Sequence, residues 1–134
     1  CRILDKEKGL SKLEAGEITH CVMAKEESRE PGRRLVASIG LALPEGNERY
    51  GYLSEHHGYG QTETEAGEFA EDIAASMLAT TLGIEFDPDK DYDERRDIYK
   101  MSGKIIHSRH ISQAALGAEG NLWTTVLAAA IFVK

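Results

Sequence analysis

The segment from Arg33 to Leu43 alternates between large apolar and small side chains at a spacing of two residues. Such alternation indicates a β-strand, because successive side chains of a strand point to opposite faces. Leu35, Ala37, Ile39, Leu41 and Leu43 form a large face, and Val36, Ser38, Gly40 and Ala42 form a small face. A strand with two such faces is usually covered on both sides. The large face suits a helix or a second sheet, and the small face suits close approach of another layer or another subunit.

A second strand follows this one after a short turn. The turn lies at residues 44–47 and contains Pro, Gly and Asn, which favour reversal of the chain. Tyr50–Gly60 then alternates again, with Gly51, Leu53 and Glu55 on one face. Residues 33–58 are therefore predicted to form a hairpin.

A long helix is predicted from about Glu63 to Leu82. Thr62 and Glu65 have the spacing of a capping box, and Gly83 suits the left-handed position that ends a helix. The periodicity predicts an inward stripe of Phe69, Ile73, Met77 and Thr80, with Ala66, Ala70 and Ala74 beside them.

Four other segments complete the predicted element order. Residues 17–25 and 102–112 are predicted to be strands, and residues 92–100 a short exposed helix. Residues 121–134 are apolar on both faces, which predicts a central, doubly covered strand. The order β-β-β-α-β-β predicts an α+β sandwich, a mainly antiparallel sheet with a helix layer, in which residues 1–134 form a single domain.

The composition restricts the possible partners and compartments. A net charge of −7 leaves no basic footprint for a nucleic acid, and no apolar run approaches the roughly 20 residues of a membrane span. The two cysteines, Cys1 and Cys21, form no CxxC pair, which favours a reducing, cytoplasmic setting over a disulfide or zinc scaffold. Because the chain begins with Cys1 and not Met, we expect a fragment or a processed product.

No metal site is predicted. Aspartates at alternate positions from 87 to 93 resemble a calcium loop, but Tyr92 stands where glycine is needed and Ile98 where the bidentate Glu is needed. The histidine pairs would point to opposite strand faces, which is poor geometry for one metal and favours surface histidines. These pairs are His56–His57 and His107–His110.

Glu55 is the candidate functional residue. It lies near the end of its predicted strand, on the same side as Gly51 and Leu53. A glutamate in this position is either a solvated residue at a strand end or an acid held beside apolar groups. The residues by themselves leave both interpretations open.

Several segments resemble one enzyme family. They are Gly16, Pro31-Gly32, Val36–Pro44, Gly51–Gly58 with its Gly-x-x-x-Glu pattern, and the alanine-rich end Ala128–Lys134. Together they resemble the α chain of pyruvoyl-dependent arginine decarboxylases, over nearly the whole chain. The resemblance implies an αββα sandwich, a separate N-terminal β chain cut from the same proenzyme, and a trimer of αβ units.

The resemblance also implies a reaction and gives Glu55 a role. The cofactor would be a covalent pyruvoyl group, made by self-cleavage at a serine expected just before Cys1. Its carbonyl would form a Schiff base with L-arginine, which loses CO₂ to give agmatine. Glu55 would be the catalytic acid that protonates the reacting carbon, in a buried, partly apolar pocket lined by Leu53, which would contact the substrate. A carboxyl stays protonated near neutral pH only where burial beside apolar groups disfavours its ion.

Two alternatives to this function stay open. One is a non-catalytic oligomeric or ligand-binding domain on the same scaffold. The other is a decarboxylase for another amino acid, because related pyruvoyl enzymes act on histidine, aspartate or S-adenosylmethionine. The residues that select the substrate are expected mostly on the β chain.

Overall fold

The computed structural model of the protein describes residues 13–46, 51–83, 92–93, 98–101 and 104–132. Its elements are β1 (Cys21–Ser28), β2 (Arg34–Pro44), β3 (Tyr52–Tyr59), α1 (Glu63–Leu82), β4 (Tyr92–Asp93), β5 (Ile98–Met101), β6 (Lys104–Leu116) and β7 (Thr124–Ile131).

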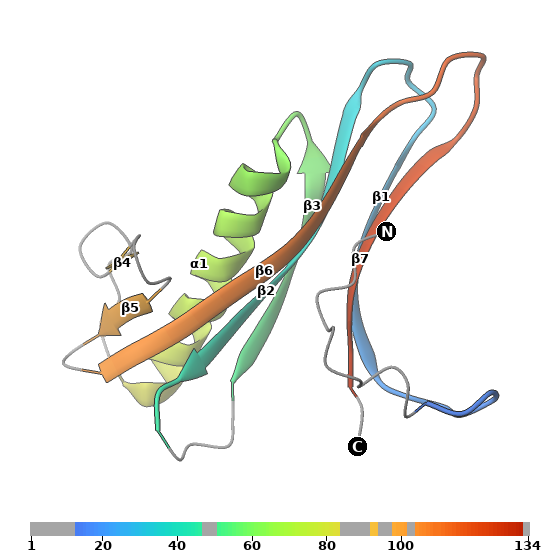
Figure 1. Ribbon diagram of the computed structural model, residues 1–134. Coiled ribbons are helices and arrows are strands. Elements are labelled where there is room, and N and C mark those ends of the chain that lie inside the picture. The colour runs from blue at the N-terminus through green and yellow to red at the C-terminus, as the bar shows by residue number, and fades with distance from the viewer. Residues whose placement is uncertain (1–12, 47–50, 84–91, 94–97, 102–103, 133–134) are drawn as a thin grey trace.

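The elements form a helix layer and two antiparallel sheets. The larger sheet has the strand order β3-β2-β6-β5-β4, and the smaller sheet pairs β1 with β7. Helix α1 covers one face of the larger sheet, and the β1–β7 pair covers the other (Figure 1). This arrangement confirms the predicted α+β sandwich. In the described parts of the chain, α1 is the one helix and forms one helix layer. The second helix layer of an αββα sandwich stays a prediction.

Strand β2 is the centre of both hydrophobic cores. It pairs with β3 as the predicted hairpin, with Ile39 opposite Glu55, and with β6 on its other side. Its small face lies under α1, where Gly40 touches the backbone of Ala70. Its large face lies between the two sheets, in one cluster of buried side chains: Ala24, Leu35, Ala37, Ile39, Val126 and Ala128. The large face therefore meets the second sheet, and the small face meets the helix.

Helix α1 has the predicted bounds, and Ala66, Ala70 and Ala74 are buried as predicted, but the large residues of the predicted inward stripe are not. The side that packs on the sheet consists mainly of small residues: Ala66, Gly67, Ala70, Glu71, Ala74, Ala75, Leu78 and Ala79. Phe69 and Met77 instead keep 48% and 43% of their surfaces exposed. The small face of β2 brings the helix backbone close to the sheet at Gly40 and Ala70, so a side chain as large as Phe69 does not fit between them there.

The start of α1 has the predicted capping box. The Thr62 hydroxyl accepts a hydrogen bond from the Glu65 backbone N–H at 3.2 Å, and the Glu65 carboxylate accepts one from the Thr62 N–H at 2.7 Å. The hydrogen bonds from the Thr62 backbone and side chain hold the pKa of Glu65 below its ordinary value. Gly83 ends the helix in the left-handed conformation, with φ of 68°.

Removing the cap should destabilise the protein measurably. We expect Thr62→Ala to lower the free energy of unfolding by about 1 kcal/mol, because the first-turn N–H groups lose an acceptor. Denaturant unfolding of the two proteins measures the difference. Thr64→Ala, also at the exposed start of the helix, is the matched control and should change the free energy much less.

Three other predictions need correction. The helix predicted at residues 92–100 is wrong, because β4 and β5 occupy its described residues as strands. Among the described residues β7 pairs with β1 alone, so it is not the predicted central strand. The first strand lies at Cys21–Ser28, further along the chain than predicted, since its polar second half still pairs with β7.

Candidate active site

Four side chains of β3 share the strand face that is turned toward the smaller sheet. Leu53 packs against the cluster of buried residues there, and Glu55, His57 and Tyr59 have the same strand parity. The opposite face of β3 belongs to the helix side, where the Ser54 hydroxyl donates a hydrogen bond to the Ala70 carbonyl. The strand faces therefore lie as the sequence predicts.

Glu55 lies at the open border of an apolar surface. Its cross-strand neighbour Ile39 is 3% exposed, and Leu53 lies two residues away on the same face. The side chain of Glu55 itself is exposed among the described residues. The predicted apolar neighbour is thus in place. The burial that an acid of this kind needs would have to come from groups outside the described residues.

A second carboxylate, Glu26 of β1, reaches the same face of β3 from the other sheet. One of its oxygens lies 2.9 Å from Nδ1 of His57, and the other accepts a hydrogen bond from the Tyr59 hydroxyl at 2.7 Å. Burial opposes the ionisation of Glu26. The hydrogen bonds from His57 and Tyr59 outweigh it, and they hold the pKa of Glu26 below its ordinary value. Glu26 is therefore an anion that joins the two sheets through His57 and Tyr59.

Tyr59 completes this contact between the sheets. Its hydroxyl also lies 2.8 Å from the Glu27 carbonyl, and the hydrogen bond to Glu26 raises the pKa of Tyr59. The Arg33 guanidinium stacks 3.7 Å from the centre of the Tyr59 ring, a cation–π contact. Sequence reasoning missed this network. Its members lie about 30 residues apart, and only the packing of the two sheets brings them together.

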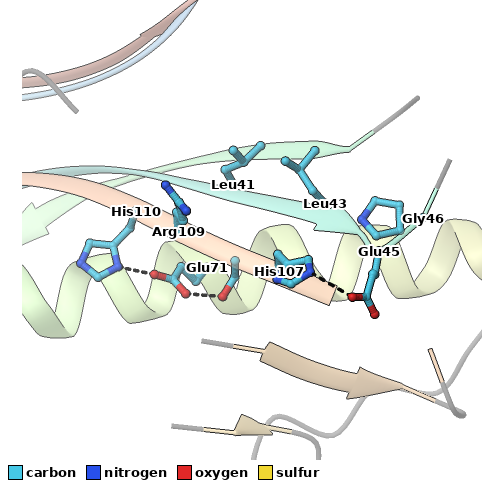
Figure 2. Close-up of a pocket in the computed structure, with 10 residues that line it drawn as sticks. Leu41, Leu43, Glu45, Gly46, Glu71, His107, Arg109 and His110 are labelled. Atoms are coloured by element: carbon cyan, nitrogen blue, oxygen red, sulfur yellow. Dashed lines mark hydrogen bonds and ion pairs between the residues drawn. The ribbon is translucent and has the colours of Figure 1, made fainter. Parts of the chain in front are cut away.

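A separate polar cluster lies on the helix side of the larger sheet. The Glu71 carboxylate of α1 is bonded to the Ser108 hydroxyl and to Nδ1 of His110, both on β6 (Figure 2). Figure 2 shows Glu71 and His110 pointing toward each other beside an open hollow whose lining does not include Glu55. Glu71 is 5% exposed, and its bonds to Ser108 and His110 give its carboxyl oxygens partners where it is buried. Of the histidines predicted to lie at the surface, His57 and His107 are exposed, but His56 and His110 are partly buried.

The described residues contain no cluster of metal ligands. They place no group of three or more His, Cys, Asp or Glu side chains where a metal ion could be held. None of their helices has the length and apolar character needed to cross a membrane.

Comparison with known proteins identifies the family. The family model for pyruvoyl-dependent arginine decarboxylase matches residues 1–134. A probable pyruvoyl-dependent arginine decarboxylase of Chlorobium limicola is 55% identical over 133 residues, which cover 99% of this chain and 73% of that protein. The corresponding protein of Chlorobaculum tepidum is 54% identical over the same shares. Pyruvoyl-dependent arginine decarboxylase 2 of Methanosarcina acetivorans is 50% identical, again with 99% and 73% covered.

The chain therefore belongs to the pyruvoyl-dependent arginine decarboxylase family. This assignment confirms the resemblance seen in the sequence and supports a decarboxylase over a non-catalytic domain. Members of the family depend on a covalently bound pyruvoyl group. The surface around Glu55 fits such a group in one respect, because it places a carboxyl beside the apolar side chains of Leu53 and Ile39.

Proposed function

We propose that Glu55 is the proton donor in the decarboxylation of L-arginine to agmatine and CO₂. The observation that carries the proposal is the position of its carboxyl beside Leu53 and Ile39, on the β3 face between the sheets. When bound, the pyruvoyl group supplies the carbonyl that accepts electrons from the breaking carbon–carbon bond. Glu55 then delivers a proton to the carbon that loses CO₂.

Leu53 has a different part in the same site. Its side chain packs on the buried cluster between the sheets and lies next to Glu55 on the strand face. An apolar wall at this point excludes water from the acid and favours its neutral form. We propose that Leu53 contacts the substrate and keeps the Glu55 carboxyl protonated once the site is closed.

The site is proposed to close on assembly. A β chain from the same proenzyme would join this chain, and αβ units would associate as trimers. Support comes from apolar surface that the described residues leave open, on the outer face of the smaller sheet and on α1: Met23, Leu127, Ile131, Phe69 and Met77. Such surface is typical of protein contacts. A cytoplasmic location is proposed with it, since the exposed Cys21 thiol is free.

Borohydride trapping of the purified enzyme with arginine tests the proposed reaction. An enzyme with a reactive carbonyl should gain the mass of one trapped arginine per active site, and should release agmatine when borohydride is omitted. Histidine and aspartate, tested in the same way, should give much less trapped adduct and much less decarboxylation product. An intact mass that borohydride and arginine leave unchanged would contradict the proposal. Light scattering that reports only single αβ units would contradict the trimer.

A further inference from the structure

We propose that His57, oriented by Glu26, returns a proton to Glu55 after each turnover. The proposal rests on the proposed role of Glu55. It makes His57 and Glu26 positioning residues that act through that acid, with no direct contact to the substrate.

The position of His57 on β3 is the first argument. Glu55 and His57 are two residues apart on one face of the strand, so their Cα atoms lie about 6.7 Å apart. Both side chains are longer than half of this spacing, so a direct contact or one bridging water can join them. The His57 side chain is 51% exposed, which gives it access to solvent protons.

The second argument is the hydrogen bond that Glu26 makes. The Glu26 side chain is only 17% exposed and its pKa is held low, so it is an acceptor without a proton of its own. Nδ1 of His57, 2.9 Å away, must therefore carry the hydrogen. This fixes the tautomer and leaves Nε2 as the nitrogen that can bind and release a proton.

The charged and titratable groups around His57 support this role. Glu26 faces it from β1, and Glu55 and Tyr59 flank it on β3. Its cross-strand neighbour on β2 is Ala37, which does not titrate. Arg33 stacks on the far side of this group, over Tyr59. Within the described residues, an imidazolium at this point faces two carboxylates, of which Glu26 is bonded to Nδ1 and Glu55 can receive the proton.

Proton balance requires that Glu55 be reprotonated in each turnover, and His57 can supply that proton. Decarboxylation replaces the carboxylate of the substrate with a hydrogen, so each turnover consumes one proton. When Glu55 gives its proton to carbon, it becomes a carboxylate. Nε2 of the His57 imidazolium then passes a proton to that carboxylate, and the neutral imidazole takes another from solvent. The net result is one solvent proton transferred to carbon, with both residues restored.

A structural ion pair between β1 and β3 is the competing explanation of the same contacts. It predicts that loss of His57 lowers stability and leaves the chemistry intact in the protein that still folds. A relay predicts a change in kcat and in its pH dependence, with KM for arginine little altered. Restoration by small molecules separates the two, because free imidazole can carry protons but cannot join two sheets.

The experiment compares His57→Ala, Glu26→Gln and the control His107→Gln in the assembled, self-processed enzyme. His107 is also an exposed histidine near a carboxylate, 4.0 Å from Glu45, but it lies on β6. For His57→Ala we expect kcat to fall about tenfold or more, as for loss of a proton-transfer group. Added imidazole should restore part of the loss, in proportion to its imidazolium concentration. Glu26→Gln should lower kcat less and shift its pH profile, and His107→Gln should match the wild type.

The outcomes also separate this proposal from the one on Glu55. If Glu55→Gln is nearly inactive while His57→Ala keeps the wild-type kcat and pH profile, the relay is wrong and the acid assignment stands. If the loss of activity in His57→Ala matches its loss of thermal stability, and imidazole restores no activity, His57 is structural and the relay is wrong. If Glu55→Gln is fully active, the failure lies with the acid assignment itself.

Discussion

Replacing Glu55 with Gln is expected to lower the rate of agmatine production at least about a hundredfold, the usual contribution of a general acid. Gln has nearly the same shape as Glu but has no acidic proton to give. Glu55 is exposed and lies opposite Ile39 on the neighbouring strand, so the change should leave folding unchanged. Arginine should still be trapped by borohydride, because that step needs the carbonyl and not this carboxyl. The loss should therefore fall on kcat and leave trapping intact.

The matched control for Glu55→Gln is Glu68→Gln. Glu68 is an exposed glutamate on α1, so the change removes the same charge away from the β3 face. Its agmatine production should equal that of the wild type. Turnover by Glu55→Gln at close to the wild-type rate would show that another group donates the proton. Equal losses in both variants would indicate a general effect of net charge.

The hairpin and the helix bounds could be predicted because their signals are local. Alternation along β2 and β3 and the capping box at Thr62 depend on residues near each other in sequence. Which side of α1 faces the sheet is not local. Both the stripe through Phe69 and the alanine-rich side have helical periodicity, and the small face of β2 decides between them. The steric limit under the helix outweighs the greater hydrophobicity of the Phe69 stripe.

The candidate site likewise has a part that the sequence predicts and a part that it does not. The face of Glu55 follows from strand alternation, and its proposed role rests on the family's Gly-x-x-x-Glu pattern. The pairing of Glu26 with His57 depends on how the two sheets are stacked, which neither strand encodes alone. The bond of Glu71 to His110 likewise needs the position of α1 on β6. One signal was present in the sequence, a glutamate on the alanine-rich side of α1, and a buried glutamate needs a partner.

The close approach of α1 to β2 leads to the largest expected change in stability, that of Gly40→Ala. A Cβ at Gly40 would lie 2.6 Å from the backbone nitrogen of Glu71 and closer still to the carbonyl group of Ala70. These are backbone atoms of a helix and cannot rotate away, so α1 must move off the sheet. Because core overpacking typically costs 1–3 kcal/mol, we expect the free energy of unfolding to fall by about 3 kcal/mol.

Gly58→Ala on the neighbouring strand is the control that isolates the steric effect of Gly40→Ala. A Cβ at Gly58 would meet only the Gln61 side-chain oxygen, at 3.9 Å, which is an ordinary contact. That variant should be as stable as the wild type or more stable by about 0.5 kcal/mol, because glycine gives the unfolded chain extra freedom. Denaturant unfolding of the assembled enzyme and the two variants measures both differences. If Gly40→Ala unfolds at the same denaturant concentration as Gly58→Ala, α1 does not lie against β2 as closely as described.

The displaced helix should also weaken the bond between Glu71 and His110, so native-state hydrogen exchange should rise along α1 in Gly40→Ala and not in Gly58→Ala.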